Sequence, residues 1–342
     1  MDGARAAPAA ASGHTPLAAS RDVLGRFGLL LVVLLMMAAL TALQPQYFLT
    51  RENLTNIARQ ISSNTVLALG QFIVVVTAGI DLSVGSVMGL SMIVVALAIN
   101  SGWPSVPALL LALGVGIGVG QLNGLALTKL HLPHPFIATL ATLNIARGAT
   151  YLLSGGVPIS GLTPTARFFG AGEIHLFRGS TLEISFPISF LIVILLCISV
   201  SIFMARTRTG RHIYAIGGSP RAASYAGINV NRLLVLVYTI SGGLAGVAGI
   251  LLAGRVNSGY PTAGTGAELD SIAAVIIGGA SFFGGRGTAS GVFFGAIIMG
   301  LLRNGLNLMN VSVFWQQVFI GLIILLAVYV DVLRRRAMRL EG

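Results

Sequence analysis

Charged residues are scarce in this chain. Only 9% of its 342 residues are Asp, Glu, Lys or Arg, whereas 55% are hydrophobic, and the mean hydropathy is +0.89. A soluble domain carries roughly 25% charged residues, so the deficit predicts an integral membrane protein with many spans. The net charge of +11 does not indicate nucleic acid as a partner, because the basic residues lie in short loops and tails between apolar runs.

Lysine occurs once, as Lys129, which excludes a conventional Gly-x-x-x-x-Gly-Lys-Ser/Thr phosphate loop. The chain therefore carries no conventional ATPase site. The histidines form no convincing set of metal ligands, and His131 and His134 are the nearest approach to one. The single cysteine, Cys197, lies in an apolar run and cannot form an internal disulfide. No catalytic residue, cofactor or metal is predicted.

Apolar runs of about 20 residues predict an all-α polytopic membrane protein with about ten transmembrane segments. Residues 1–20 are rich in Ala, Ser, Gly and Pro and lack the apolar core of a signal peptide, so we expect a disordered cytoplasmic tail. Residues 21–342 are expected to form one transmembrane domain. The ten predicted segments cover residues 25–43, 62–80, 84–100, 105–128, 135–154, 185–205, 232–253, 270–284, 287–306 and 312–331.

The distribution of basic residues predicts the orientation. With the N-terminus inside, fourteen of the 21 Lys and Arg residues fall on the cytoplasmic side, six fall outside and Arg147 falls within a segment. An excess of basic residues marks the cytoplasmic side of a membrane protein. Both termini are therefore expected in the cytoplasm, as an even number of spans requires.

The segment from Thr77 to Ser86 places polar side chains between two long apolar runs. A bilayer core has no water to satisfy such groups, so they must face protein or a cavity. We expect Asp81 to cap the third segment, with direct substrate contact as the alternative. The segment is a candidate for lining or bracing a transport path through Asp81, Ser83 and Ser86, with Gly79 and Gly85 as structural glycines.

Arg147 is the one charge placed well inside a predicted segment. A guanidinium there is costly unless it is paired or hydrated, and Asn144, about one helical turn away, could share a polar network with it. Alternatively, the segment boundary is misplaced and Arg147 lies at the interface. Asn123 and Asn144 join the candidate residues of the path.

Glycines mark two further features. Small residues from Gly114 to Gly120 and from Gly242 to Gly249 recur at spacings that let helices approach tightly in lipid. Residues 278–287 are half glycine and predict a tight cytoplasmic turn. The glycines expected to be structural in that turn are Gly278, Gly279, Gly284 and Gly285.

The cytoplasmic loop 206–232 contains a complete set of helix signals. Ser219 is a good N-cap, Pro220 suits the first helical position, and Gly227 suits the stop. A short helix from Ser219 to Ala226 is therefore predicted. It is either a connector lying on the membrane or a docking helix for a cytoplasmic partner.

Several motifs in order resemble the permease subunits of the ribose-type, branched family of ABC importers, over nearly all of the chain after Arg21. They are Gly79–Gly85 (GIDLSVG), Gly124–Lys129, Pro135–Leu140, Arg147-Gly148 with Gly155-Gly156, Thr209–Gly218, Ala222–Ile228 and Ile277–Gly287.

The resemblance implies a permease domain over residues 21–342 in a bacterial inner membrane, with a second permease copy or a paralogue. It also implies cytoplasmic ATPase subunits, a periplasmic sugar-binding protein and a path at the permease–permease interface. The substrate would be a monosaccharide or related polyol. The residues of the implied coupling helix are Ser219, Pro220, Arg221, Ala222, Ala223, Tyr225 and Gly227.

Two other transport classes remain open from the residues themselves. An ion-coupled secondary transporter needs titratable groups within the bilayer. Its candidates are Asp81, Asp270, which could instead cap the eighth segment, and Asp331, and all three lie near predicted segment ends. A passive polyol channel would give the Ser219–Ala226 helix no purpose.

Overall fold

The structure, a computed structural model, describes residues 16–176 and 184–340. It is an all-α polytopic membrane protein, as the composition predicts. Six helices in these ranges are long and apolar enough to cross a membrane. They are α4 (Ser105–Lys129), α5 (Pro135–Ser154), α7 (Ile188–Arg206), α10 (Val230–Val256), α12 (Ala289–Leu308) and α13 (Val313–Leu340), the last through its stretch Val313–Leu333.

A helix covers part of each of the ten predicted segments. Six of these helices are the long apolar ones named above, and the remaining four are α1 (Pro16–Leu43), α2 (Arg51–Val76), α3 (Val84–Asn100) and α11 (Ala267–Ile277). Three short helices complete the described set: α6 (Pro164–Ala171), α8 (Arg208–Gly218) and α9 (Pro220–Tyr225). Of the predicted tail over residues 1–20, residues 1–15 lie outside the described ranges, and α1 begins at Pro16.

Two predicted segments differ from their helices. The segment at 62–80 corresponds to α2, which begins at Arg51 because Thr50 accepts a hydrogen bond from the amide of Asn53 as its N-cap. The polar first half of α2 gives no hydropathy signal. The segment at 270–284 corresponds to α11, which has 11 residues and spans about 17 Å, roughly half of a bilayer core.

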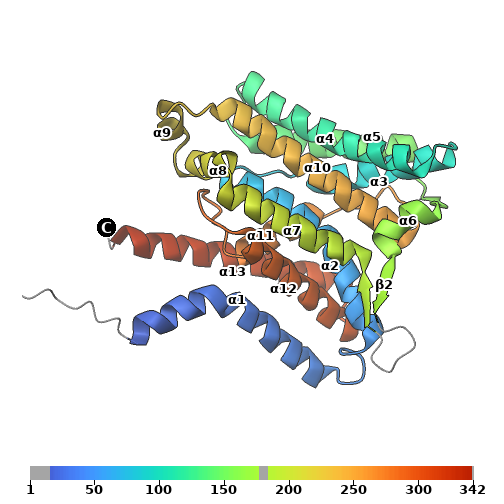
Figure 1. The fold of residues 1–342 in the computed structure, drawn as a ribbon, viewed down its shortest axis with the longest axis horizontal. Helices are drawn as coiled ribbons and strands as arrows, with labels where there is room; N and C mark the ends of the chain where they lie inside the picture. The colour runs from blue at the N-terminus through green and yellow to red at the C-terminus, as the bar shows by residue number, and fades with distance from the viewer. Residues whose placement is uncertain (1–15, 177–183, 341–342) are drawn as a thin grey trace, which may run out of the picture.

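Helix α2 is the centre of the bundle, and every residue from Thr65 to Thr77 is buried. Helix α10 packs along α2, α3 and α4, and α4 and α5 lie at one edge of the molecule while α1 lies at the other (Figure 1). The core is therefore built around two helices, α2 and α10, that are far apart in the sequence.

The predicted glycine face forms the α4–α10 contact. A Cβ atom added at Gly116 would lie 2.5 Å from the carbonyl oxygen of Gly242, and one added at Gly120 would overlap the carbonyl oxygen of Tyr238. Glycine lets the two backbones touch. Gly118 does not share this role, because no described atom lies within 4 Å of a Cβ added there.

Short strands tie the loops at one end of the bundle. Strand β1 (Ile159–Ser160) pairs antiparallel with β4 (Ser258–Gly259), and β2 (Glu173–Leu176) pairs antiparallel with β3 (Ile184–Pro187). The long connection over residues 155–183 holds β1, α6 and β2, and its last seven residues lie outside the described ranges. At the opposite end lie α8, α9, the start of α1 and the end of α13 (Figure 1).

Candidate functional site

Asp81 lies in the turn between α2 and α3 and is 1% exposed. Its Oδ1 accepts hydrogen bonds from the amide of Ser83 at 3.0 Å and from the hydroxyl of Ser83 at 2.6 Å. Ser83 is the N-cap of α3 and makes no side-chain cap hydrogen bond itself. The predicted capping of the third segment by Asp81 is therefore wrong: the carboxylate binds the residue before the helix, and the described hydrogen bonds give it no amide of the first turn.

The second oxygen of Asp81 joins this turn to distant helices. Ser241 of α10 donates its hydroxyl to Oδ2 at 2.9 Å, and Asn123 of α4 donates its amide to Oγ of Ser83 at 2.8 Å. Oriented to satisfy both groups, the side-chain amide of Gln71 in α2 pairs with the backbone of Asp81, at 3.0 Å to its carbonyl and 3.2 Å from its amide. We call these five residues the Asp81 network; it fastens α2, α3, α4 and α10 together.

Sequence reasoning missed two members of this network. Ser241 gives no local signal, because serine is common in tightly packed membrane helices. Gln71 does give one, since it is the only buried residue of α2 with a side-chain amide, and a buried amide requires partners. Its partner, the backbone of Asp81, lies only ten positions away.

The candidate path residues fall into two groups. Asp81, Ser83, Ser86 and Asn123 are each 1% exposed, so they lie inside the core of a single chain. Asn144 of α5 is exposed. Of these five residues, only Asn144 lies on the surface of the chain.

Arg147 and Asn144 do not share a polar network. Nη1 of Arg147 donates to the carbonyl oxygens of Pro261 and Ala263, both at 2.7 Å, whereas the amide of Asn144 donates to the carbonyl of Leu140 at 3.0 Å. The predicted shared network is therefore wrong. Arg147 instead fixes α5 to the loop between β4 and α11, which satisfies its guanidinium with backbone oxygens.

The other two candidate carboxylates have partners of their own. Nη2 of Arg303 in α12 contacts both oxygens of Asp270, at 2.7 and 2.6 Å. Asp270 therefore pairs α11 with α12 and does not cap the predicted eighth segment. Oδ2 of Asp331 in α13 accepts from the hydroxyl of Ser281 and the amide of Phe282, both at 3.2 Å. These contacts do not connect the three carboxylates into a relay.

Residues 278–288, which we call the glycine-rich loop, connect α11 to α12. A Cβ atom added at Gly278 would lie 2.5 Å from the carbonyl oxygen of Gly291, so this glycine allows close approach of the two helix ends. Gly284 has φ +82°, a conformation that other residues rarely adopt. The side-chain hydroxyl of Thr288 then accepts from the amide of Gly291 at 3.1 Å and begins α12.

The predicted helix after Ser219 is confirmed as α9. The hydroxyl of Ser219 accepts from the amide of Ala222 at 3.2 Å, Pro220 occupies the first helical position, and Gly227 has φ +81°. Tyr225 is 91% exposed, and Ala223 is only 4% exposed. Beside α9 lies a hollow of about 550 Å³ lined by Pro220, Arg221, Ser224, Gly227, Ile228, Asn229, Val230 and Asn231.

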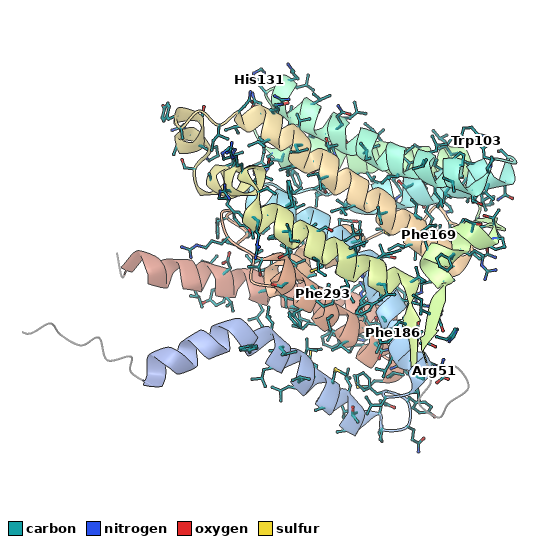
Figure 2. All side chains as sticks on the ribbon, viewed as in Figure 1. Arg51, Trp103, His131, Phe169, Phe186 and Phe293 are labelled. Atoms are coloured by element: carbon teal, nitrogen blue, oxygen red, sulfur yellow. The ribbon has the colours of Figure 1, made fainter. Side chains whose placement is uncertain are left out.

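Side-chain positions separate the two ends of the molecule. His131, just after α4, lies at the end that carries α8 and α9, whereas Trp103, Arg51 and Phe186 lie at the opposite end (Figure 2). His134 has a local role: its Nδ1 accepts a hydrogen bond from the amide of Phe136 at 3.3 Å and caps α5. The described residues contain no group of three His, Cys, Asp or Glu side chains that could hold a metal ion.

Residues 53–328 match the family model described as "Branched-chain amino acid transport system / permease component". The chain belongs to this family. It is 40% identical over 303 residues to the ribose import permease protein RbsC of Escherichia coli K12, covering 88% of this chain and 92% of the relative. The Bacillus subtilis ribose import permease protein RbsC is 40% identical over 311 residues, covering 90% of this chain and 93% of the relative.

The D-allose transport system permease protein AlsC of Escherichia coli K12 is 37% identical over 307 residues, covering 90% of this chain and 91% of the relative. No solved structure matches the chain. The family match over residues 53–328 includes α9, the glycine-rich loop and the Asp81 network.

Proposed function

We propose that this chain is the membrane-spanning permease subunit of an ATP-binding-cassette importer and moves a monosaccharide or related polyol into the cytoplasm. The observation that carries the proposal is the 40% identity over 88% of the chain to a ribose import permease. The energy comes from a separate ATPase subunit, because Lys129 is the only lysine and does not belong to a phosphate loop. A periplasmic sugar-binding protein delivers the substrate.

We further propose ten membrane-crossing segments with both termini inside a bacterial inner membrane. The ten helices that overlie the predicted segments support this number, although α11 crosses only with the help of the glycine-rich loop. The start of α1, the end of α13, α8 and α9 all lie at one end of the molecule (Figure 1). That end carries Lys129, Arg206, Arg208, Arg211, Arg221, Arg232 and Arg286, as a cytoplasmic face should.

Helix α9 is the proposed coupling helix. Its exposed Arg221 and Tyr225 lie four positions apart and so share one helical face. An arginine and an aromatic are good interface anchors, and the hollow beside α9 offers room for a partner's side chains. In this proposal Ser219, Pro220 and Gly227 shape the helix, Ala222 lies on its outer side, and Ala223 secures it from beneath.

The proposed path runs between two permease copies. The exposed face of α5 carries Asn144 beside apolar side chains, of which Ile145 is 70% and Leu152 is 86% exposed. A membrane-facing amide without a second chain would be costly. The Asp81 network, being buried within one chain, braces this path and does not line it.

Reconstitution tests the function. The permease, purified with its cognate ATPase, is reconstituted in liposomes that enclose the nucleotide, the binding protein and labelled ribose are added outside, and uptake of the ribose is measured. Uptake is expected with MgATP and no ion gradient, and is not expected with a non-hydrolysable analogue or with an ATPase whose phosphate-loop lysine is replaced. Uptake driven by a proton or sodium gradient without ATP would replace this proposal with a secondary transporter, and nucleotide-independent equilibration would replace it with a channel.

A further inference from the structure

Three backbone segments meet at one point: the end of α2, the glycine-rich loop and the end of α8. The amide of Gly285 in the glycine-rich loop donates to the carbonyl oxygen of Val76, the last residue of α2, at 2.9 Å. Gly217, near the end of α8, lies against both: a Cβ atom added there would overlap the carbonyl oxygen of Val76 and the amide nitrogen of Gly285. Helix α8 therefore touches the end of α2 and the glycine-rich loop without an intervening side chain.

The contact continues past the end of α2. A Cβ atom added at Gly284 would lie 2.9 Å from the amide nitrogen of Ala78 and 3.0 Å from the carbonyl oxygen of Gly217. Backbone segments that pack directly against one another have little room to move relative to each other, because protein interiors are close-packed. A displacement of α8 must then move Val76 and Ala78 as well.

Tyr214 sets the position of α8 on this contact. It lies three positions before Gly217, on the same helical face, and its hydroxyl donates to the carbonyl oxygen of Gly287 at 2.8 Å. Burial raises the pKa of Tyr214, so its phenol keeps the proton it donates. Ile213 and Ile216, at 0% and 1% exposure, seat the rest of α8 in the core.

The glycine-rich loop is held from its other side too. The carboxylate of Asp331 in α13 accepts from the hydroxyl of Ser281 and the amide of Phe282. The loop is thus fastened to α13 at one end and to α2 and α8 at the other. The loop therefore links α13 to the contact between α8 and the end of α2.

Both ends of this arrangement connect to features already described. Gly218 and Ser219 alone separate Gly217 from α9, and Asp81 follows Val76 by five residues. One route from the proposed coupling helix to the Asp81 network therefore passes through Gly217. Docking of an ATPase on α9 does not itself require a tyrosine or a glycine at these two half-buried positions of α8.

We propose that Tyr214 and Gly217 are positioning residues for transport: they clamp α8 onto Val76 and the glycine-rich loop, so that a displacement of α9 is passed to the Asp81 turn. This inference rests on the proposed function, and it adds the intramolecular connection that such coupling needs. The clamp consists of Tyr214, Gly217, Val76, Gly285 and Gly287.

Adjacent glycines give a matched pair for the test. Gly217→Ala adds a methyl group inside the clamp, whereas Gly218→Ala adds the same group where no described atom lies within 4 Å. Tyr214→Phe removes only the hydroxyl that binds Gly287, and Tyr47→Phe removes a hydroxyl from an exposed tyrosine far from α8. Each variant is purified with its ATPase, and ribose uptake, ATP hydrolysis and co-purification are measured on the same preparation.

Gly217→Ala is expected to retain the ATPase and hydrolyse ATP while the ribose moved per ATP falls about tenfold. Tyr214→Phe is expected to lower the same ratio about fivefold, the effect of one lost hydrogen bond. Gly218→Ala and Tyr47→Phe are expected to stay within about twofold of the parent. If the Gly217→Ala variant fails to assemble with the ATPase, the ribose moved per ATP by the Tyr214→Phe variant decides the test.

An unchanged ratio of ribose to ATP in Tyr214→Phe, or in an assembled Gly217→Ala variant, overturns the clamp. A fall of the same size in Gly218→Ala also overturns it, because any change in α8 would then suffice. These results differ from a failure of the proposed function, which would appear in the parent protein as uptake without ATP or as no bound ATPase.

Discussion

The hydroxyl of Ser241 donates a 2.9 Å hydrogen bond to Oδ2 of Asp81, although the two residues are 160 positions apart. Both are 1% exposed. A buried carboxylate is stable only when donors satisfy its oxygens, and here the donors come from the turn itself and from α10. The position of α10 is thereby fixed relative to the start of α3.

Removing the acceptors of Asp81 should disturb assembly in proportion to the hydrogen bonds lost. Asp81→Asn keeps one acceptor oxygen and is expected to cost about 1 kcal/mol, whereas Asp81→Leu leaves the Ser83 and Ser241 donors unpaired and is expected to cost about 3 kcal/mol or more. Thermal denaturation of the detergent-solubilised permease measures both. Equal loss of transport by two variants of parental stability would show instead that the charge of Asp81 itself is needed.

The α4–α10 contact should tolerate a methyl group on one face of α4 only. Gly120→Ala would overlap the carbonyl oxygen of Tyr238, and we expect a loss of about 1–3 kcal/mol with less assembled permease in the membrane. Gly118→Ala, its control two positions away, meets no described atom within 4 Å and is expected to be neutral or to gain up to about 1 kcal/mol. Similar losses at both positions would mean that glycine serves α4 through flexibility and not through contact.

The Asp270–Arg303 pair should behave as a unit. The two side chains are 10% and 27% exposed, so breaking the pair leaves a charge largely out of water. Asp270→Asn or Arg303→Gln alone is expected to destabilise the permease by about 2 kcal/mol, and the double variant by less than the sum of the two. Additive losses in this double-mutant cycle would show that the pair contributes no coupling energy.

Docking on α9 should be sensitive to a charge on its outer side. Ala222 is exposed and Ala223 is buried, so Ala222→Glu is the informative change and Ala222→Ser is its control. The glutamate variant is expected to insert normally, to lose its ATPase during purification and to lower ATP-driven ribose uptake at least about tenfold. Retained co-purification with ribose-stimulated hydrolysis would remove α9 from the docking interface.

The sequence by itself determined the class of this protein and much of its local structure. Hydropathy placed a predicted segment on each of the six described helices that are long and apolar enough to cross a membrane, because a bilayer demands long apolar runs. The capping residues Ser219 and Pro220 defined α9 because helix ends are set by neighbours three or four positions away. The spacing of Gly116 and Gly120 marked a contact face for the same reason, since helical period is a local property.

Only the tertiary structure decided which polar groups meet. In the sequence, Asp81 has the residue type and the position of a helix cap. In the structure, its second carboxylate oxygen accepts a hydrogen bond from Ser241 in another helix. Arg147 does not bind Asn144, which is one helical turn away. It donates hydrogen bonds to two carbonyl oxygens more than a hundred positions distant. Such partners are set by how the helices pack, because a buried polar group takes whichever donor or acceptor the fold brings within about 3 Å.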